Sequence, residues 1–157
     1  MHIVLNNIRS GWNVGSIMRT CDGLGAKLIL IGYTPKPINR NLKLINKTAI
    51  GAENSVEWEH FEHYQEVFQK YSSINYNHVG IEISDTSKDI FNFLKTQDLK
   101  FKENVIWFGN EIHGLDKDLL QFLNNEVHLP MKGMKESLNV ANAVCTVGYL
   151  FLEHQAL

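Results

Sequence analysis

The feature of the sequence that most constrains the fold is an apolar run near its end, because this run leaves no continuous polar face. Residues 138–152 read as one long helix, whereas a surface helix buries a stripe only about 100° wide or slightly wider. A chain of 157 residues covers one side of such a helix with its own sheet. We therefore expect a second copy of the chain to cover the other side, and Val144→Glu or Val147→Glu to separate the two copies by burying an unpaired charge.

A short strand and a loop lead into this helix. We expect the strand at residues 127–129, and a loop shaped by Pro130 and Gly133 after it. Ser137 or Asn139 is expected to cap the helix, whose first N–H groups are unpaired and suit an oxygen-rich ligand. The loop before the helix is therefore a candidate ligand site.

Strands alternate with helices or long connections along the whole chain. Such alternation is typical of an α/β fold, so we predict a mostly parallel sheet with helices on both faces. The strands are expected at residues 2–7, 27–31, 56–60, 78–83, 105–108 and 127–129, and the helices at residues 14–24, 64–71 and 117–123 and in the last segment, with single helical turns at 42–45 and 90–94.

The first predicted helix, residues 14–24, carries an arginine away from its apolar stripe. Asn13 is its expected N-cap and Gly25 its stop. Arg19 and Gly15 project together, one turn apart, so the glycine is expected to leave open space beside the arginine. An arginine near a helix start that follows a strand is a candidate ligand contact. The alternative is an exposed arginine with no such role.

Charge is unevenly distributed along a chain whose formal net charge is −2. Residues 53–66 carry five glutamates and no Lys or Arg, while residues 36–47 carry basic residues and no acid. A local basic region can contact phosphates even when the whole chain is not basic. The alternative is a solvated loop. The basic residues of this region are Lys36, Arg40, Lys43 and Lys47.

Composition and simple motifs argue against several classes of protein. We expect a soluble, cytoplasmic protein, because no apolar run approaches the roughly 18 residues of a membrane span and no signal-peptide pattern begins the sequence. The length predicts a single domain over residues 1–157. Cys21 and Cys145 lie in apolar helical patterns and are expected to be reduced core thiols. We expect no metal site, since only His60 and His63 form a close pair.

Polar and glycine residues follow three of the predicted strands. Parallel strands bring such loops together at the carboxyl edge of the sheet, where ligands bind. Mixed apolar side chains and backbone groups suit an adenine-type ligand, but neither glycine-rich phosphate motif, G-x-x-x-x-G-K-[ST] or G-x-G-x-x-G, occurs. The residues concerned are Glu82 and Ile83, which follow Ile81 at the end of one strand, Gly109, Asn110 with its amide and Glu111 with its carboxylate after the second, and Pro130 and Gly133 after the third.

Three motifs, in the order of the chain, resemble those of the SpoU/TrmH family, the S-adenosylmethionine-dependent RNA 2′-O-ribose methyltransferases of the SPOUT class. Residues 13–19 resemble an N-x-G-x-x-x-R motif, residues 109–115 a G-N-E-x-x-G-L motif, and residues 130–140 a P-M-x-G motif followed by S-L-N-V. Each motif alone is weak, whereas three in order over the whole chain are specific. The chain is therefore identified as a member of this family.

The resemblance implies a trefoil knot, S-adenosylmethionine as cofactor without a metal, and a homodimer through the C-terminal helix and the first helix. Arg19 is then either the base for the ribose 2′-hydroxyl, which needs a strongly lowered pKa, or a group that orients ribose or phosphate. It is also expected to reach toward the cofactor of the other subunit. The implied catalytic residues are Asn13, Arg19, Glu111, Ser137 and Asn139; the implied cofactor-binding residues are Glu82, Ile83, Gly109, Asn110, Leu129, Met131, Ser137 and Leu138.

The resemblance also implies an RNA substrate, and we rank tRNA above ribosomal RNA. Without the extra RNA-binding segments of many relatives, the chain is expected to be a minimal catalytic domain. Either its basic residues suffice across a dimer, or an auxiliary RNA-binding protein assists. Two alternatives are a non-catalytic RNA-binding or assembly module of the same fold and a generic nucleotide-binding domain. The expected RNA contacts are Arg9, Arg19, Lys36, Arg40, Lys43 and Lys47, with Lys132 and Lys135 in addition.

Overall fold

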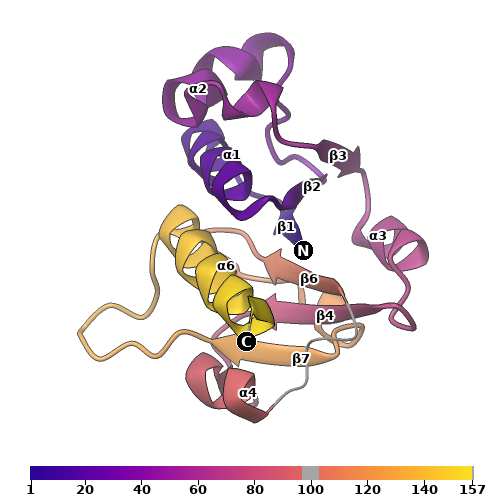
Figure 1. Ribbon diagram of the computed structural model, residues 1–157, viewed down its shortest axis with the longest axis vertical. Helices are drawn as coiled ribbons and strands as arrows, with labels where there is room; N and C mark the ends of the chain where they lie inside the picture. The colour runs from indigo at the N-terminus through magenta and orange to yellow at the C-terminus, as the bar shows by residue number, and fades with distance from the viewer. Residues whose placement is uncertain (97–102, 157) are drawn as a thin grey trace.

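A seven-stranded parallel sheet forms the centre of the computed structural model, which describes residues 1–96 and 103–156 (Figure 1). The strand order is β3-β2-β1-β6-β4-β7-β5, and every described strand pair is parallel. The predicted α/β fold is confirmed. The strands are β1 (His2–Asn6), β2 (Lys27–Ile31), β3 (Trp58–Phe61), β4 (Tyr76–Ile81), β5 (Lys88–Asp89), β6 (Glu103–Phe108) and β7 (Asn125–His128).

Helices cover both faces of this sheet, as predicted. Successive residues of a strand point to opposite faces, so Ile3 and Leu5 of β1 join one apolar cluster and Val4 joins the other. The first cluster includes residues of α1, α2, α4 and α6, and the second includes residues of α3 and α5. The helices are α1 (Gly11–Leu24), α2 (Asn39–Ala49), α3 (Tyr64–Lys70), α4 (Ile90–Thr96), α5 (Lys117–Leu120) and α6 (Val140–Ala156), with a 3₁₀ turn, η1, at Ala52–Asn54.

Helix α1 begins three residues earlier than the sequence predicts. Ser10 is its N-cap, because the Ser10 hydroxyl accepts a hydrogen bond of 3.3 Å from the backbone N–H of Asn13. The prediction that Asn13 caps this helix is therefore wrong, since Asn13 lies inside the first turn. The apolar stripe starts only at Val14, so the pattern gave no sign of the preceding turn. Gly25 ends the helix at φ 60°, as predicted.

The single turn expected at residues 42–45 is a complete helix, α2, and it packs closely on α1. A Cβ at Gly15 would lie 2.2 Å from the carbonyl oxygen of Ile45 and 2.3 Å from the hydroxyl oxygen of Thr48. The prediction that Gly15 leaves open space beside Arg19 is therefore wrong. The glycine instead lets the backbones of the two helices approach each other.

Helix α6 is buried on one side only, and it lies beside α1 (Figure 1). Val144 and Val147 are fully buried in the core of the subunit, so glutamate at either position destabilises the subunit itself and does not test a dimer as expected. Tyr149 is 48% exposed and Leu152 is 37% exposed. Cys145 is also exposed, so its prediction as a core thiol is wrong.

Other segment boundaries differ from the prediction by a few residues. Strand β4 ends at Ile81, so Glu82 and Ile83 lie in the loop after it. Helix α5 ends at Leu120 instead of residue 123, whereas α4 is longer than the single turn expected. Cys21 is buried as expected, and burial raises the pKa of its thiol to about 12. The trefoil knot implied by the resemblance stays a prediction.

Candidate functional site

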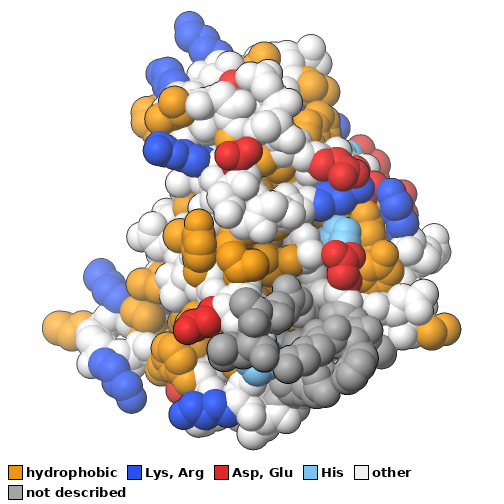
Figure 2. All heavy atoms as spheres, viewed as in Figure 1, with side chains coloured by type: hydrophobic (Ala, Val, Ile, Leu, Met, Phe, Trp, Pro, Cys, Tyr) orange, Lys and Arg blue, Asp and Glu red, His pale blue; other side chains and the backbone are white. Residues whose placement is uncertain are grey.

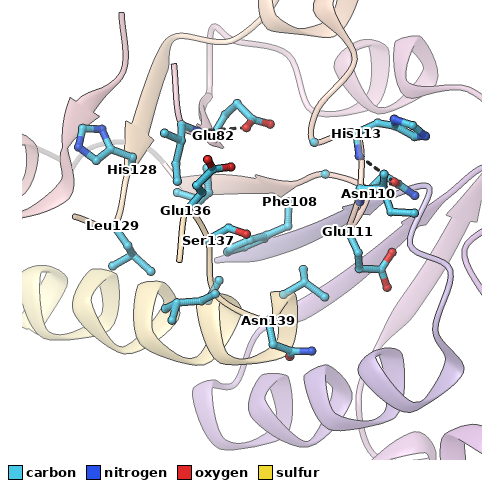
Figure 3. A pocket seen from close by; sticks show the side chains of 18 of the residues that line it. Glu82, Phe108, Asn110, Glu111, His113, His128, Leu129, Glu136, Ser137 and Asn139 are labelled. Carbon is cyan, nitrogen blue, oxygen red and sulfur yellow. Dashed lines mark hydrogen bonds between the residues drawn. The ribbon is translucent and has the colours of Figure 1, made fainter. Parts of the chain in front are cut away.

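A cavity of about 560 Å³ lies at the carboxyl edge of the sheet, where β4, β6 and β7 end (Figure 3). Its walls are the loops that follow these strands and the first turn of α6. The volume lies in the range of roughly 300–1,000 Å³ that is usual for small-molecule sites. Every residue predicted to bind the cofactor lines this cavity, namely Glu82, Ile83, Gly109, Asn110, Leu129, Met131, Ser137 and Leu138.

The loop after β6 folds back on itself to form one wall. The backbone N–H of Asn110 donates to the Gly114 carbonyl over 3.0 Å, and the N–H of Gly114 donates to the Asn110 carbonyl over 2.9 Å. A Cβ at Gly109 would lie 2.1 Å from the carbonyl carbon of Gly114. Only glycine fits at position 109 without opening the loop, which explains this part of the G-N-E motif physically.

The side chain of Asn110 orders this loop. Its Nδ2 donates to the carbonyl oxygen of Asn7 at 2.8 Å and to the hydroxyl of Tyr33 at 2.9 Å. Its Oδ1 accepts hydrogen bonds from the backbone N–H groups of Ile112 and His113 at 2.9 and 3.0 Å (Figure 3). Because these contacts occupy the buried amide, we correct its expected role from offering a ligand contact to holding the wall in place.

Three of the predicted catalytic residues are joined by side-chain hydrogen bonds at the rim of the cavity. Nδ2 of Asn139 donates to Oδ1 of Asn13 over 3.2 Å, and Nδ2 of Asn13 donates to Oε1 of Glu111 over 3.0 Å. Oδ1 of Asn139 also accepts from the N–H of Ala141 at 2.9 Å, so Asn139 is the cap of α6. Residues from all three motifs therefore meet at one place, which their separation in the sequence does not reveal.

The carboxylate of Glu111 also holds the start of α1. Its two oxygens accept hydrogen bonds from the backbone N–H groups of Arg9 and Ser10, over 3.0 and 3.3 Å. Partial burial acts to raise the pKa of Glu111, but the hydrogen bonds from Arg9, Asn13 and Ser10 outweigh it and lower the pKa. Glu111 is therefore an anion that ties the loop after β6 to the loop after β1.

The other two predicted catalytic residues, Arg19 and Ser137, are not part of this hydrogen-bonded group. Ser137 lines the cavity and is exposed. Arg19 is exposed on α1, does not line the cavity, and makes no hydrogen bond or ion pair with any residue that the structure describes. It lies about 9 Å further along the helix axis than Asn13, given a rise of about 1.5 Å per residue. A single subunit therefore does not bring Arg19 into the cavity.

The cavity is acidic. Glu82, Glu111 and Glu136 line it, and none of the described lining residues is Lys or Arg. The carboxylate of Glu82 is held by the N–H groups of Leu115 and Ile83, at 2.7 and 3.1 Å. Such a lining favours a cationic ligand over a phosphate.

Sequence reasoning missed several residues that line the cavity. Glu136 directly precedes Ser137, and His113 occupies a variable position of the G-N-E-x-x-G-L motif, so closeness to motif residues was the only available signal. His128 lies at the end of β7, where its Nδ1 is 2.9 Å from the hydroxyl of Ser87. This contact orients the imidazole and comes from a residue 41 positions away.

The basic residues expected to contact RNA lie mainly on α2, away from the acidic cavity. Figure 2 shows Lys and Arg side chains gathered at the end of the molecule that α2 forms. Arg40, Lys43 and Lys47 are exposed there, and Lys36 precedes the helix. Arg9 is exposed beside the rim, where its N–H binds Glu111.

Within residues 1–96 and 103–156, no group of three or more His, Cys, Asp or Glu side chains is arranged to hold a metal ion. In the same part of the chain, every helix is too short or too polar to cross a membrane.

Comparison with known proteins agrees with the motifs. Residues 1–149 match the family described as "SpoU rRNA Methylase family". The chain is 26% identical over 149 residues to a tRNA (guanosine(18)-2′-O)-methyltransferase of Aquifex aeolicus, covering 94% of this chain and 66% of that protein. The chain thus spans slightly less than two thirds of that relative.

Solved structures show the same fold at low sequence identity. The SpoU methyltransferase AviRb from Streptomyces viridochromogenes, in complex with the cofactor AdoMet, matches with a TM-score of 0.84 at 23% identity, over 99% of this chain and 58% of that chain. A structure described as giving insight into 2-OH methylation of C/U34 on tRNA matches with a TM-score of 0.78 at 21% identity, over 99% of this chain and 95% of that chain.

Proposed function

Because this chain belongs to the SpoU rRNA Methylase family of RNA methyltransferases, we propose that it transfers a methyl group from S-adenosylmethionine to a ribose 2′-hydroxyl of RNA. The observation that carries the proposal is the cavity at the carboxyl edge of the sheet, lined by residues of two of the family motifs. A hydrogen-bonded chain from Asn139 through Asn13 to Glu111 adds the remaining motif at the rim of the cavity.

The chemistry of the cavity fits this cofactor. S-adenosylmethionine, when bound, supplies a methyl group on a positively charged sulfur. The carboxylates of Glu82, Glu111 and Glu136 complement that charge, and the loops offer backbone groups beside apolar side chains such as Leu129 and Leu138. The cofactor contacts predicted from the sequence are retained in the proposal, except that the amide of Asn110 acts by holding the loop.

The residues of the chain act by positioning, which supplies much of the rate in a displacement between two held reactants. Asn13, Glu111 and Asn139 hold the rim, and Ser137 offers a hydroxyl inside the cavity. Arg19 orients the ribose or a phosphate and stabilises negative charge that develops on the 2′-oxygen. Since Arg19 is outside the cavity of its own subunit, it acts on the cavity of a second subunit.

We propose a homodimer through α6, because Arg19 then acts on the cavity of a second subunit. The exposed side of this helix carries Cys145, Tyr149 and Leu152, and the hydroxyl of Tyr149 lies 2.9 Å from the place of a Cβ at Gly23 of α1. A two-fold contact over α6 therefore also involves α1, which carries Arg19. In sedimentation, Tyr149→Glu combined with Leu152→Glu is expected to give monomers with unchanged far-UV circular dichroism, and a monomeric wild type contradicts the dimer.

We favour tRNA as the substrate, in the cytoplasm. The Aquifex aeolicus relative is named for methylation of a tRNA guanosine, and the C/U34 structure is named for tRNA as well. Ribosomal RNA is the alternative, because the matching family is described by rRNA methylation. An auxiliary RNA-binding protein is indicated only if the purified protein fails to methylate RNA alone and does so after cell extract is added.

The decisive experiment incubates the purified protein with S-adenosylmethionine labelled in its methyl group and with total tRNA or ribosomal RNA. Nuclease digestion is expected to release a labelled 2′-O-methyl nucleoside from tRNA. Arg19→Ala is expected to lose transfer while its affinity for S-adenosylmethionine stays unchanged, and Gln69→Ala on α3 serves as an exposed control. Full activity of Arg19→Ala contradicts the role given to Arg19.

Calorimetry tests the cofactor independently of RNA. S-adenosylmethionine is expected to bind, whereas NAD and ATP are not, because no basic side chain lines the described cavity to receive phosphates. Absence of S-adenosylmethionine binding rules out the proposed function. Binding of S-adenosylmethionine and RNA without methylation of any RNA pool favours a non-catalytic module of the same fold.

A further inference from the structure

Trp12 is an exposed tryptophan beside the candidate site. It lies in the first turn of α1 and is 52% exposed, whereas Trp107 is fully buried in the core. A large aromatic side chain left in solvent contributes little to folding, and exposed apolar surface at a site often marks a contact with a partner. The backbone of Trp12 is fixed, because its carbonyl accepts a hydrogen bond of 2.8 Å from the hydroxyl of Thr48.

The side chain of Lys47, on α2, lies beside this ring. Nζ of Lys47 lies 5.3 Å from the centroid of the Trp12 ring. The pair places an aromatic surface and a positive charge next to each other at the junction of α1 and α2. A nucleotide offers the matching pair of groups, a base with a π face and a phosphate.

The position of Trp12 connects this pair to the cavity. The next residue, Asn13, makes the hydrogen bonds to Glu111 and Asn139 at the rim. A second aromatic ring, Tyr33, is 60% exposed, and its hydroxyl accepts a hydrogen bond from Asn110 in the cavity wall. Two exposed aromatic residues are therefore tied to the site, Trp12 in the first turn of α1 through its neighbour Asn13 and Tyr33 in the loop after β2 through Asn110.

The charge around Trp12 indicates which kind of molecule binds this surface. Residues 36–47 carry basic residues and no acid, and the exposed Arg9 lies in the loop just before α1. The cavity itself is acidic, so the phosphates of a polyanion are attracted to the surface around Trp12 and not to the cavity. Unpaired RNA bases are commonly recognised by stacking on aromatic side chains while basic residues follow the backbone.

We propose that Trp12 stacks on an unpaired base of the RNA substrate that neighbours the methylated nucleotide, with Lys47 contacting an adjacent phosphate. The inference rests on the proposed function and adds the residue that recognises an unpaired segment. Tyr33, whose hydroxyl binds Asn110 of the cavity wall, provides a second exposed aromatic surface. Methylation therefore requires the target to lie in a loop or another single-stranded segment.

Tryptophan fluorescence tests the stacking without relying on methyl transfer. The chain has three tryptophans, of which Trp12 is the most exposed. Titration of the full chain with tRNA is expected to quench its fluorescence. Trp12→Phe is expected to lose most of the quenching while keeping most of the affinity for tRNA. The control is Trp58→Phe, which changes the half-buried tryptophan of β3 and is expected to keep the quenching. Quenching that persists in Trp12→Phe overturns the proposal.

Affinity and salt dependence separate the aromatic contact from the charge. Trp12→Ala is expected to raise the Kd for tRNA by about tenfold or more, to raise the KM for RNA more than it lowers kcat, and to leave the Kd for S-adenosylmethionine unchanged. Lys47→Ala is expected to reduce the slope of log Kd against log salt by about one, whereas Trp12→Ala leaves the slope unchanged. An unchanged Kd for tRNA in Trp12→Ala overturns the proposal.

The outcomes distinguish this inference from the proposed function. If the wild type methylates RNA and Trp12→Ala is indistinguishable from it, the stacking fails and the proposed function stands. If the wild type methylates no RNA but Trp12-dependent quenching by RNA occurs, the proposed function fails and the stacking stands. If Trp12→Ala changes sedimentation and not RNA affinity, Trp12 contacts a second copy of the chain and the proposal is overturned.

Discussion

Two cavities of similar size lie at opposite edges of the sheet, about 560 Å³ at the carboxyl edge and about 620 Å³ at the amino edge. At the amino edge the charged side chains bind one another. Glu59 accepts hydrogen bonds from Lys70 and Tyr71 and lies 3.2 Å from Nζ of Lys27. Figure 2 shows acidic and basic side chains mixed beside β3 and α3.

At the carboxyl edge two polar side chains are left for a ligand. Glu136 and Ser137 line that cavity and make no hydrogen bond or ion pair with any residue described in the structure. The loops there are held by backbone contacts and by buried amides such as that of Asn110. Volume alone does not distinguish the two cavities. The comparison teaches that a binding site is recognised by polar side chains without a partner among the described residues, here Glu136 and Ser137, beside loops that other contacts hold in place.

The largest expected effect is on ligand binding at the carboxyl edge, from Gly109→Ala. The added methyl group meets the Gly114 carbonyl carbon at 2.1 Å and the Leu115 nitrogen at 2.3 Å, so the loop must open. Overpacking of this kind costs about 1–3 kcal/mol, and we expect S-adenosylmethionine affinity to fall about 10- to 100-fold in calorimetry. Gly133→Ala is the matched control, because a Cβ there meets nothing within 4 Å. Equal affinities for the two variants contradict the comparison.

At the amino edge, Glu59→Gln is expected to lower stability and leave ligand affinity intact. Hydrogen bonds from Lys70, Tyr71 and Lys27 lower the pKa of Glu59 although burial acts to raise it. Removing this charge leaves its partners uncompensated, at a cost of about 2 kcal/mol in the free energy of unfolding by urea. Glu57→Gln is the control, since Glu57 also pairs with Lys27 but its side chain is 73% exposed. A loss of cofactor affinity in Glu59→Gln contradicts the inference that the amino edge contributes stability and the carboxyl edge contributes ligand binding.

Stability is also expected to fall as the pH drops below about 6.5, through His78 near the amino edge. Burial lowers the pKa of His78, and His2, whose pKa burial also lowers, acts in the same direction. Between the ordinary pKa and the lowered one, the unfolded chain binds a proton that the folded chain does not. The free energy of unfolding then decreases by at most about 1.4 kcal/mol per pH unit for this group.

The structure explains why His78 resists protonation. Trp107 donates a hydrogen bond of 3.0 Å to its Nδ1, which must therefore carry no proton, and Nε2 binds the carbonyl oxygen of Tyr71. Urea unfolding at pH 7.0 and 5.5 measures the effect. A His78→Gln variant is expected to show a smaller difference between the two pH values, and an unchanged difference assigns the pH dependence to other groups.

The smallest expected effect is that of Glu136→Gln in the carboxyl-edge cavity. Glu136 is exposed, so solvent screens its charge. We expect a loss of S-adenosylmethionine affinity of a few fold that grows at low salt. Affinity for S-adenosylhomocysteine, whose sulfur is neutral, should change less, and Glu62→Gln is the control, because Glu62 is exposed after the outer strand β3 and does not line the cavity. An equal loss for both ligands shows that charge is not the cause.

Much of the site was predictable because its residues fall into short contiguous motifs. Gly109, Asn110 and Glu111 follow a buried strand directly, and parallel strands bring the loops after β4, β6 and β7 to one edge. The residues predicted to bind the cofactor line one cavity. The contacts of Asn110 with Asn7 and Tyr33 were not predictable, since the latter partner lies 77 positions away.

The sequence by itself determined most of the elements and the family, because apolar periodicity and short motifs depend only on neighbouring residues. It established six of the seven described strands, the loops after them and the unusual apolarity of α6, but it missed β5 and gave α2 only as a single turn. Only the tertiary structure decided which side of α6 the core covers, that α2 fills the space beside Gly15, and that Arg19 lies outside the cavity. The physical reason is that periodicity shows which side of an element is apolar, whereas the partner that covers it comes from a distant part of the chain.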